Sequence, residues 1–252
     1  MEISNAALYG KGVFTTISIQ DCNPFLWKKH WKRLSDNSTK VAIDLSDFSE
    51  NMIEEFLDEA IRENKVIDGR ARITFSDKSE SKIWARGNSQ KTSLSIITGG
   101  LRPIADNFKL TVSPYPVNSH SPLAGVKSCN YLENIIALDE AKARAFDEAV
   151  RVNDRGTITS AAMANVFWLK DDQLHTPSLK TGCLAGTTRE YVLENIDCRE
   201  VEAGMDELDQ ADAIYLTSAG IGIIEVADFN GRNRLSRSHP INALWPIARN
   251  AG

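Results

Sequence analysis

One lysine in this sequence stands in a setting that suits covalent chemistry by an amine. Lys127 follows the small residue Gly125 and the apolar residue Val126. An amine attacks an aldehyde only when it is uncharged, and a lysine loses its proton readily when its side chain is removed from water. The setting therefore indicates an amine able to form an imine, although a lysine judged by position alone is more typical of a solvated surface.

A second group of residues suits the binding of a phosphate. Gly186, Thr187 and Thr188 stand at the start of a helix predicted over 188–195. Backbone N–H groups, hydroxyls and the positive end of the helix dipole together favour an anion at such a point. The same residues would equally serve as an ordinary helix N-cap.

Composition and charge exclude several other classes of function. The chain has 252 residues, of which 42% are hydrophobic and 25% charged, and its net charge is -5. The 29 basic residues are spread along the chain, so we expect small molecules and not nucleic acid as partners. We also expect a cytoplasmic protein, because no apolar run is long enough to span a bilayer and the first residues do not resemble a secretory signal.

The cysteines and histidines do not form a metal-binding pattern. None of the cysteines has CxxC spacing, which favours reduced thiols over a zinc site or a disulfide framework. His30, His175 and His239 show no metal-ligand spacing, so the sequence assigns them no role. The four cysteines are Cys22, Cys129, Cys183 and Cys198.

The hydrophobic pattern predicts helices packed on sheets in two halves of the chain. Apolar residues recur at helical spacing over 28–41, 48–62, 131–146 and 188–195. Runs of β-branched and aromatic residues predict strands at 12–19, 71–75, 94–98, 109–112, 148–153, 166–169, 213–217 and 222–226. The segment 113–125 contains three prolines and separates the two halves.

Five ordered blocks of the sequence resemble the class IV aminotransferases, a family of pyridoxal-phosphate enzymes. The block around the lysine reads SPLAGVKSCNYLEN at residues 121–134. Before it stand YGKGVFTT at 9–16 and HWKRL at 30–34, and after it stand the blocks 147–170 and 176–189. Together they cover most of the chain.

The resemblance implies an α+β fold made of two α/β domains, of the D-amino-acid aminotransferase type. It implies that pyridoxal 5'-phosphate is held between the domains, usually in a homodimer. We therefore predict an N-terminal α/β domain over 1–99, an interdomain segment over 100–125 and a C-terminal cofactor-binding domain over 126–252.

The resemblance also implies roles for individual residues. Lys127 would bond covalently to the cofactor and Tyr131 would meet its phenolate oxygen, while Thr16 would lie near the lysine. Taken singly, these positions are also typical of structural strand, turn, cap or surface residues. The implied phosphate contacts are Arg33, Thr188, Thr217 and Ser218, with Thr187 beside them at the helix start.

One position departs from the family. Ser160 stands where members usually have a glutamate, whose carboxylate keeps the cofactor's ring nitrogen protonated and makes the ring an electron sink. A serine hydroxyl supplies no negative charge, so transamination should suffer most. A β-elimination should suffer less, because the developing charge can leave with the departing group. Ser160 therefore points towards a lyase, or towards lost activity.

Three functions stay open within the family. The sequences at 14–16, 121–125 and 164–168 resemble aminodeoxychorismate lyase, in which Lys127 would remove a ring proton and Thr16 would help to protonate the leaving group. The alternatives are a transaminase of D-alanine or branched-chain amino acids, and a degenerate homologue without catalysis. Arg86, Arg102 and His120 are possible contacts for substrate carboxylates, although their polar settings favour surface positions.

Overall fold

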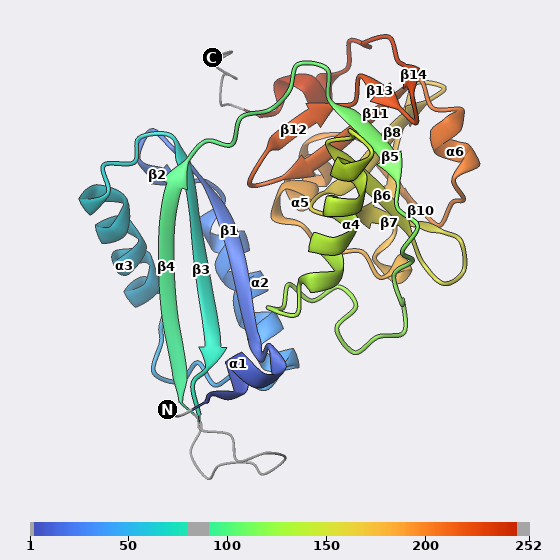
Figure 1. Cartoon of the computed structure of the whole chain (residues 1–252). Coiled ribbons are helices and arrows are strands. Elements are labelled where there is room, and N and C mark those ends of the chain that lie inside the picture. The colour runs from blue at the N-terminus through green and yellow to red at the C-terminus, as the bar shows by residue number, and fades with distance from the viewer. Residues whose placement is uncertain (1–2, 80–90, 246–252) are drawn as a thin grey trace. The chain divides into compact units, whose positions relative to one another are not determined.

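The computed structural model describes residues 3–79 and 91–245 of the chain, which forms two compact units (Figure 1). Unit 1 comprises Met1–Arg102 together with Val126–Tyr131, and unit 2 comprises Pro103–Gly125 together with Leu132–Gly252. The short segment Val126–Tyr131 therefore packs with the first unit, whereas the sequence places it at the start of the second domain.

Unit 1 is built on a four-stranded antiparallel sheet in the order β2-β1-β3-β4. Helix α3 begins after Ser49, whose hydroxyl accepts a hydrogen bond from the backbone N–H of Met52. The elements in chain order are α1 (Asn5–Tyr9), β1 (Gly12–Gln20), β2 (Asn23–Pro24), α2 (Trp27–Lys40), α3 (Glu50–Glu63), β3 (Gly69–Asp77) and β4 (Thr92–Gly100).

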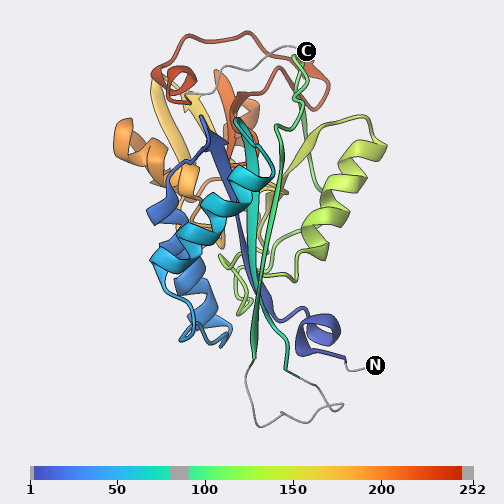
Figure 2. The ribbon, with the colours of Figure 1, turned by 90° about the vertical axis from the view of Figure 1, so that its left-hand side faces the viewer.

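The core of unit 1 lies between one face of this sheet and the helices α2 and α3. Alternate residues of β1, among them Val13, Ile17 and Ile19, are fully buried on that face. They pack against Leu34 of α2 and Leu57 of α3. Figure 2 shows both helices lying along the sheet. The period-two pattern of β1 and the helical pattern of its two neighbours therefore account for the layered arrangement.

Unit 2 contains two five-stranded sheets, in the orders β10-β9-β8-β11-β12 and β14-β13-β5-β6-β7. Its strands are β5 (Lys109–Val112), β6 (Glu148–Val152), β7 (Ile158–Ala161), β8 (Asn165–Lys170), β9 (Gln173–Pro177), β10 (Cys198–Val201), β11 (Ala213–Ser218), β12 (Gly222–Glu225), β13 (Asp228–Phe229) and β14 (Arg232–Asn233). Its helices are α4 (Leu132–Ala143), η1 (Leu179–Thr181), α5 (Thr187–Asn195), α6 (Asp206–Asp209) and η2 (Pro240–Ala243).

The core of unit 2 joins its two sheets. Leu110 and Val150 of the second sheet belong to the same buried cluster as Trp168 and Ile214 of the first. Phe167 lies in a separate cluster on the other face of β8, together with residues of α5 and η2. Because β8 is covered on both faces, it reads as a continuous apolar run in the sequence.

The predicted α+β class is confirmed, and each predicted helix and strand occurs within a few residues of its expected bounds. The helix expected over 131–146 ends at Ala143, and Ala145 turns out of the helix with a φ of 63°. The elements α1, β7 and β10 were not predicted because they are too short for a periodic signal. In the part of the chain that the structure describes, no helix has both the length and the apolar character needed to cross a membrane.

Candidate active site

Lys127 lies on a short extended segment that adds to the edge of β1. The backbone N–H of Phe14 donates to the carbonyl of Lys127 at 3.0 Å, and the N–H of Cys129 donates to the carbonyl of Gly12 at 2.8 Å. These bonds flank an antiparallel bridge. Lys127 therefore stands directly across from Phe14, and the two side chains leave the same face of the backbone.

The amine of Lys127 lies against two aromatic rings. Its Nζ is 4.7 Å from the ring centroid of Phe14 and 4.8 Å from that of Tyr131, and it donates a hydrogen bond to the Tyr131 hydroxyl at 3.3 Å. The two rings meet edge to face, with their centroids 5.1 Å apart. The guanidinium of Arg72 lies over the Phe14 ring, 3.6 Å from its centroid. The rings therefore fix the place of the amine and exclude water from part of its surroundings.

This setting lowers the pKa of Lys127 from 10.5 to about 7. Burial is the largest cause, and the positive charges of Arg33 and Arg72 add to it. All three disfavour the protonated amine. Near neutral pH a large share of the amine is therefore uncharged, as attack on a carbonyl or removal of a proton requires. The apolar neighbours of Lys127 in the sequence predicted this state. Arg33 was expected only as a phosphate contact and Arg72 was not expected at all, so their effect on the pKa of Lys127 was not predicted.

Arg33 and His30 lie one helical turn apart on α2, and both contact Thr15 of β1. The Nη2 of Arg33 donates to the Thr15 hydroxyl oxygen at 2.7 Å, and the Nδ1 of His30 lies 2.7 Å from the same atom. Thr15 and His30 are both buried. Burial, followed by the charges of Arg33 and Lys127, holds the pKa of His30 well below its ordinary value of 6.5. Arg33 is the phosphate anchor expected from the sequence, whereas His30 was assigned no role.

Thr16 is the direct partner of Arg72 in the β1–β3 pair. Because side chains alternate along a strand, Thr16 leaves the same face of β1 as Phe14, two residues away. Arg72 was also missed by the sequence reading. It stands 55 residues before the lysine in the chain, and only the register of β1 with β3 brings it into the same cluster. The face of unit 1 that carries Phe14 thus combines a neutral amine, a hydroxyl and a fixed guanidinium.

The expected phosphate residues of unit 2 converge around Asn165. A side-chain carbon at Gly186 would collide with the Asn165 Oδ1, so the start of α5 approaches β8 as closely as only glycine allows. Asn165 is in turn the strand partner of Thr217 at the end of β11. Thr187 and Thr188 are buried in the first turn of α5, and Ser218 is the last residue of β11.

Two hydroxyls at this point fit an anion. The Oγ1 atoms of Thr188 and Thr217 are buried without a hydrogen-bond partner in the described part of the protein. Leaving a buried hydroxyl without a partner costs about 1–3 kcal/mol. An acceptor such as phosphate would remove that cost, and the N-terminal dipole of α5 would attract it. The residues of unit 2 therefore fit a phosphate group.

Ser160 lies on β7, directly across from Arg151 of β6. Arg151 is buried and donates to the backbone carbonyls of Tyr115 and Pro116, each at 3.2 Å. The buried acid Glu148 does not take the place of the missing glutamate. Its carboxylate accepts backbone hydrogen bonds at 2.9–3.0 Å around the β7–β8 turn, and its odd spacing from Arg151 puts it on the opposite face of β6. The strand pair thus presents a hydroxyl beside an arginine, which is itself paired with the carboxylate of Glu133 at 3.5 Å.

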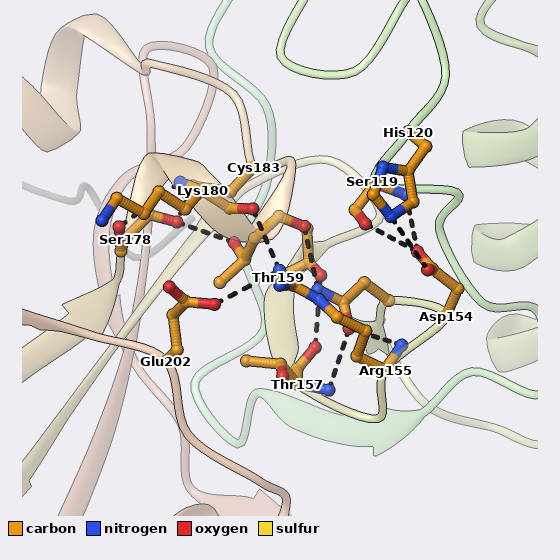
Figure 3. A network of polar contacts seen from close by, with 12 residues as sticks. Ser119, His120, Asp154, Arg155, Thr157, Thr159, Ser178, Lys180, Cys183 and Glu202 are labelled. Atoms are coloured by element: carbon orange, nitrogen blue, oxygen red, sulfur yellow. Dashed lines mark hydrogen bonds and ion pairs between the residues drawn. The ribbon is translucent and has the colours of Figure 1, made fainter.

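A network of polar contacts in unit 2 holds the segment that precedes Lys127 (Figure 3). The backbone N–H and the hydroxyl of Ser119 both donate to one carboxylate oxygen of Asp154, at 2.8 Å and 2.7 Å. These bonds lower the pKa of Asp154. Further along, the N–H of Gly125 donates to the carbonyl of Gly182. The chain is therefore fixed up to two residues before the lysine.

The structure adds little support for the residues that the sequence suggests as contacts for substrate carboxylates. The His120 side chain is 81% exposed and lies 3.8 Å from the carboxylate of Asp154. Arg102 is half-buried at the end of unit 1, where its charge helps to lower the pKa of Arg70. Arg86 lies outside the described residues. Over 3–79 and 91–245, no group of three or more His, Cys, Asp or Glu side chains is placed to hold a metal ion.

Comparison with known proteins identifies the family and the fold. The family model for amino-transferase class IV matches residues 12–229. A putative branched-chain-amino-acid aminotransferase of Methanocaldococcus jannaschii is 28% identical over 235 residues, covering 89% of this chain and 81% of that protein. The aminodeoxychorismate lyase of Bacillus subtilis is 28% identical over 240 residues, covering 92% and 82%. The crystal structure of a putative 4-amino-4-deoxychorismate lyase from Legionella pneumophila superposes with a TM-score of 0.86 at 25% identity, covering 95% of this chain and 90% of that one.

Proposed function

Because the chain belongs to the class IV aminotransferase family, we propose that it is a pyridoxal-5'-phosphate enzyme that converts 4-amino-4-deoxychorismate to 4-aminobenzoate and pyruvate. The observation that carries the proposal is the amine of Lys127, which lies against two rings with a pKa of about 7. A solvated structural lysine would not lose its proton near neutral pH. Lysine is the one side chain that can both bond to an aldehyde and return as a base.

Both units supply residues that suit this cofactor. Lys127 would hold it covalently, the Tyr131 hydroxyl would meet its phenolic oxygen, and Arg33 would pair with its phosphate. In unit 2 the hydroxyls of Thr188 and Thr217, which are unpartnered in the described part of the chain, would suit a phosphate as well. When bound, the cofactor supplies an aldehyde that condenses with the substrate amine and a ring that withdraws electrons from it.

Lys127 would perform the proton transfer at the substrate. With a pKa of about 7, roughly half of the amine is uncharged at pH 7, so Nζ can accept the ring proton next to the substrate nitrogen. The Tyr131 hydroxyl, 3.3 Å away, keeps the amine directed while it is free. The charges of Arg33 and Arg72 keep the pKa of the base low, which favours release of that proton afterwards.

Thr16 would act on the leaving group. Its hydroxyl leaves β1 on the same face as Phe14, across from which Lys127 stands. It can donate a hydrogen bond to the ether oxygen of the departing enolpyruvate, while Arg72 beside it offsets negative charge that develops there. Formation of the aromatic product then drives the elimination forward.

The pair of Ser160 and Arg151 favours the lyase over the transaminase. Neither residue supplies the carboxylate that would keep the ring nitrogen protonated. An elimination needs less electron withdrawal than transamination, because its charge leaves with the enolpyruvate. The similarity to the putative branched-chain-amino-acid aminotransferase keeps amino-group transfer as the second candidate.

One incubation distinguishes the lyase from the transaminase. The purified protein with pyridoxal phosphate is given aminodeoxychorismate, and 4-aminobenzoate and pyruvate are measured, with Lys127→Ala as the matched control. Equal release of both products by the wild type, and none by the variant, is the expected result. Amino-group exchange with branched-chain or D-alanine-derived 2-oxo acids, without 4-aminobenzoate, would select the transaminase. Failure of the folded protein to bind the cofactor would contradict both functions.

A further inference from the structure

Three side chains of unit 1 form a continuous hydrogen-bonded chain that ends at Arg33. Thr15 leaves β1 on the face covered by α2, where its hydroxyl oxygen meets both Arg33 Nη2 and His30 Nδ1, each at 2.7 Å. Thr15 is 0% exposed and His30 is 1% exposed. The spacing of His30 and Arg33 by three residues on α2 lets both side chains reach one atom.

The chemistry of the Arg33 guanidinium fixes the direction of the first bond. A guanidinium only donates hydrogen bonds, so the Thr15 oxygen accepts from Arg33. The Thr15 hydroxyl keeps a second lone pair and one hydrogen, so it can bond to His30 Nδ1 in either tautomer of the imidazole. Burial and the neighbouring charges of Arg33 and Lys127 keep the pKa of His30 low, in agreement with a neutral imidazole. Arg33 therefore donates to Thr15, and Thr15 is in turn held by its hydrogen bond to His30.

We propose that His30 and Thr15 are positioning residues that orient the Arg33 guanidinium toward the cofactor phosphate. The inference rests on the proposed function, because it takes Arg33 as a phosphate contact. Arginine recognises phosphate through a rigid fork of donors, so its affinity depends on the angle at which the fork is held. Arg33 is only half-buried, and a fixed acceptor at Nη2 limits the rotation of that fork before the ligand arrives.

The test compares ligands that differ only in the phosphate. Apo-protein is titrated with pyridoxal phosphate and with pyridoxal, and each dissociation constant is measured by absorbance. Thr15→Val removes the hydroxyl and His30→Leu removes the ring nitrogen bonded to it, each at nearly constant volume. We expect each to weaken the binding of pyridoxal phosphate about tenfold, the equivalent of one hydrogen bond to a charged group, and to leave pyridoxal unaffected.

Conservative variants provide the matched controls. Thr15→Ser keeps the hydroxyl, and His30→Asn keeps a polar group that can donate or accept in the place of Nδ1, so both should restore affinity to within about threefold of the wild type. Thr15→Val should also add nothing to the loss caused by Arg33→Leu, because the pair acts as one unit. The unfolding midpoint of every variant is measured alongside.

The outcomes separate this inference from the proposed function. Equal losses for pyridoxal and pyridoxal phosphate would mean that His30 and Thr15 serve only the fold. Unchanged binding by Thr15→Val, or losses that add to that of Arg33→Leu, would overturn the positioning role and leave the cofactor assignment intact. A folded wild-type protein that binds neither ligand would overturn both.

Discussion

Replacement of Lys127 by methionine should stabilise the apo-protein while abolishing its chemistry. The folded state lowers the pKa of this lysine from 10.5 to about 7, so folding must expel a proton or bury a charge. Methionine has a similar length and no charge. At pH 7 the shift corresponds to about 4 kcal/mol of unfolding free energy, as an upper value because Lys127 keeps some exposed surface. Loss of the hydrogen bond to Tyr131 offsets about 1 kcal/mol, which leaves a gain of about 3 kcal/mol.

The gain in unfolding free energy should decrease as the pH rises. The pKa of Lys127 is lower in the folded than in the unfolded state, so its cost is fully present below pH 7 and disappears as the pH rises through 10.5. We therefore expect the net gain of Lys127→Met to be largest at about pH 6, to fall to about 1 kcal/mol by about pH 9, and to become a loss of about 1 kcal/mol by about pH 11, where only the missing hydrogen bond to Tyr131 remains.

Urea unfolding of the two apo-proteins at these pH values measures the effect. Lys170→Met is the matched control, because a hydrogen bond to Glu207 raises the pKa of Lys170 and its removal should not increase stability. A variant at position 127 that is no more stable than the wild type at pH 6, or a gain that does not change with pH, would show that Lys127 is an ordinary solvated lysine. Such a result would contradict the proposed chemistry, which requires an amine with a lowered pKa.

Three further changes test other parts of the site. Thr188→Val should weaken cofactor binding about tenfold, because a buried hydroxyl can no longer meet the phosphate, while Thr188→Ser should not; equal titration curves would contradict this. Ser160→Glu should raise the ratio of amino-group exchange to 4-aminobenzoate release above those of the wild type and Ser160→Gln, and an unchanged ratio would remove the ring-nitrogen argument. Gly186→Ala should lower the unfolding free energy by about 1–3 kcal/mol through its collision with Asn165, whereas Gly100→Ala, in open space, should not, as chemical unfolding would show.

The sequence predicts the residues whose signal is local. The helix start at Thr187 and the strand that carries Thr16 can be read from a few neighbouring letters, because caps and alternation are short-range patterns. Lys127 could be singled out only through its block, since burial of a lysine is not visible in composition. The roles of these site residues stay predictions that the experiments above address. The homodimer and the cytoplasmic location also stay predictions.

His30 and Arg72 show what a local pattern leaves out. Arg72 joins the cluster around Phe14 through the register of two strands more than fifty residues apart. His30 reaches Thr15, on the opposite face of β1, through the packing of α2 on that strand. The spacing of His30 and Arg33 could have indicated their shared role, because residues three positions apart on a helix lie on the same face. The buried cation at Arg151 beside Ser160 likewise depends on strand pairing and cannot be read from either segment alone.

The backbone pairing of Lys127 with Phe14 limits how unit 1 can be divided into fragments of the chain. Unit 1 is not one continuous stretch of chain, because Lys127 arrives only after 23 residues that belong to unit 2, Pro103–Gly125. A fragment ending at Arg102 would contain the strands of unit 1 with Arg33 and Arg72, but not Lys127. A single crossover between Arg102 and Lys127 in a recombination of two relatives would likewise join the arginines of one parent to the lysine of the other.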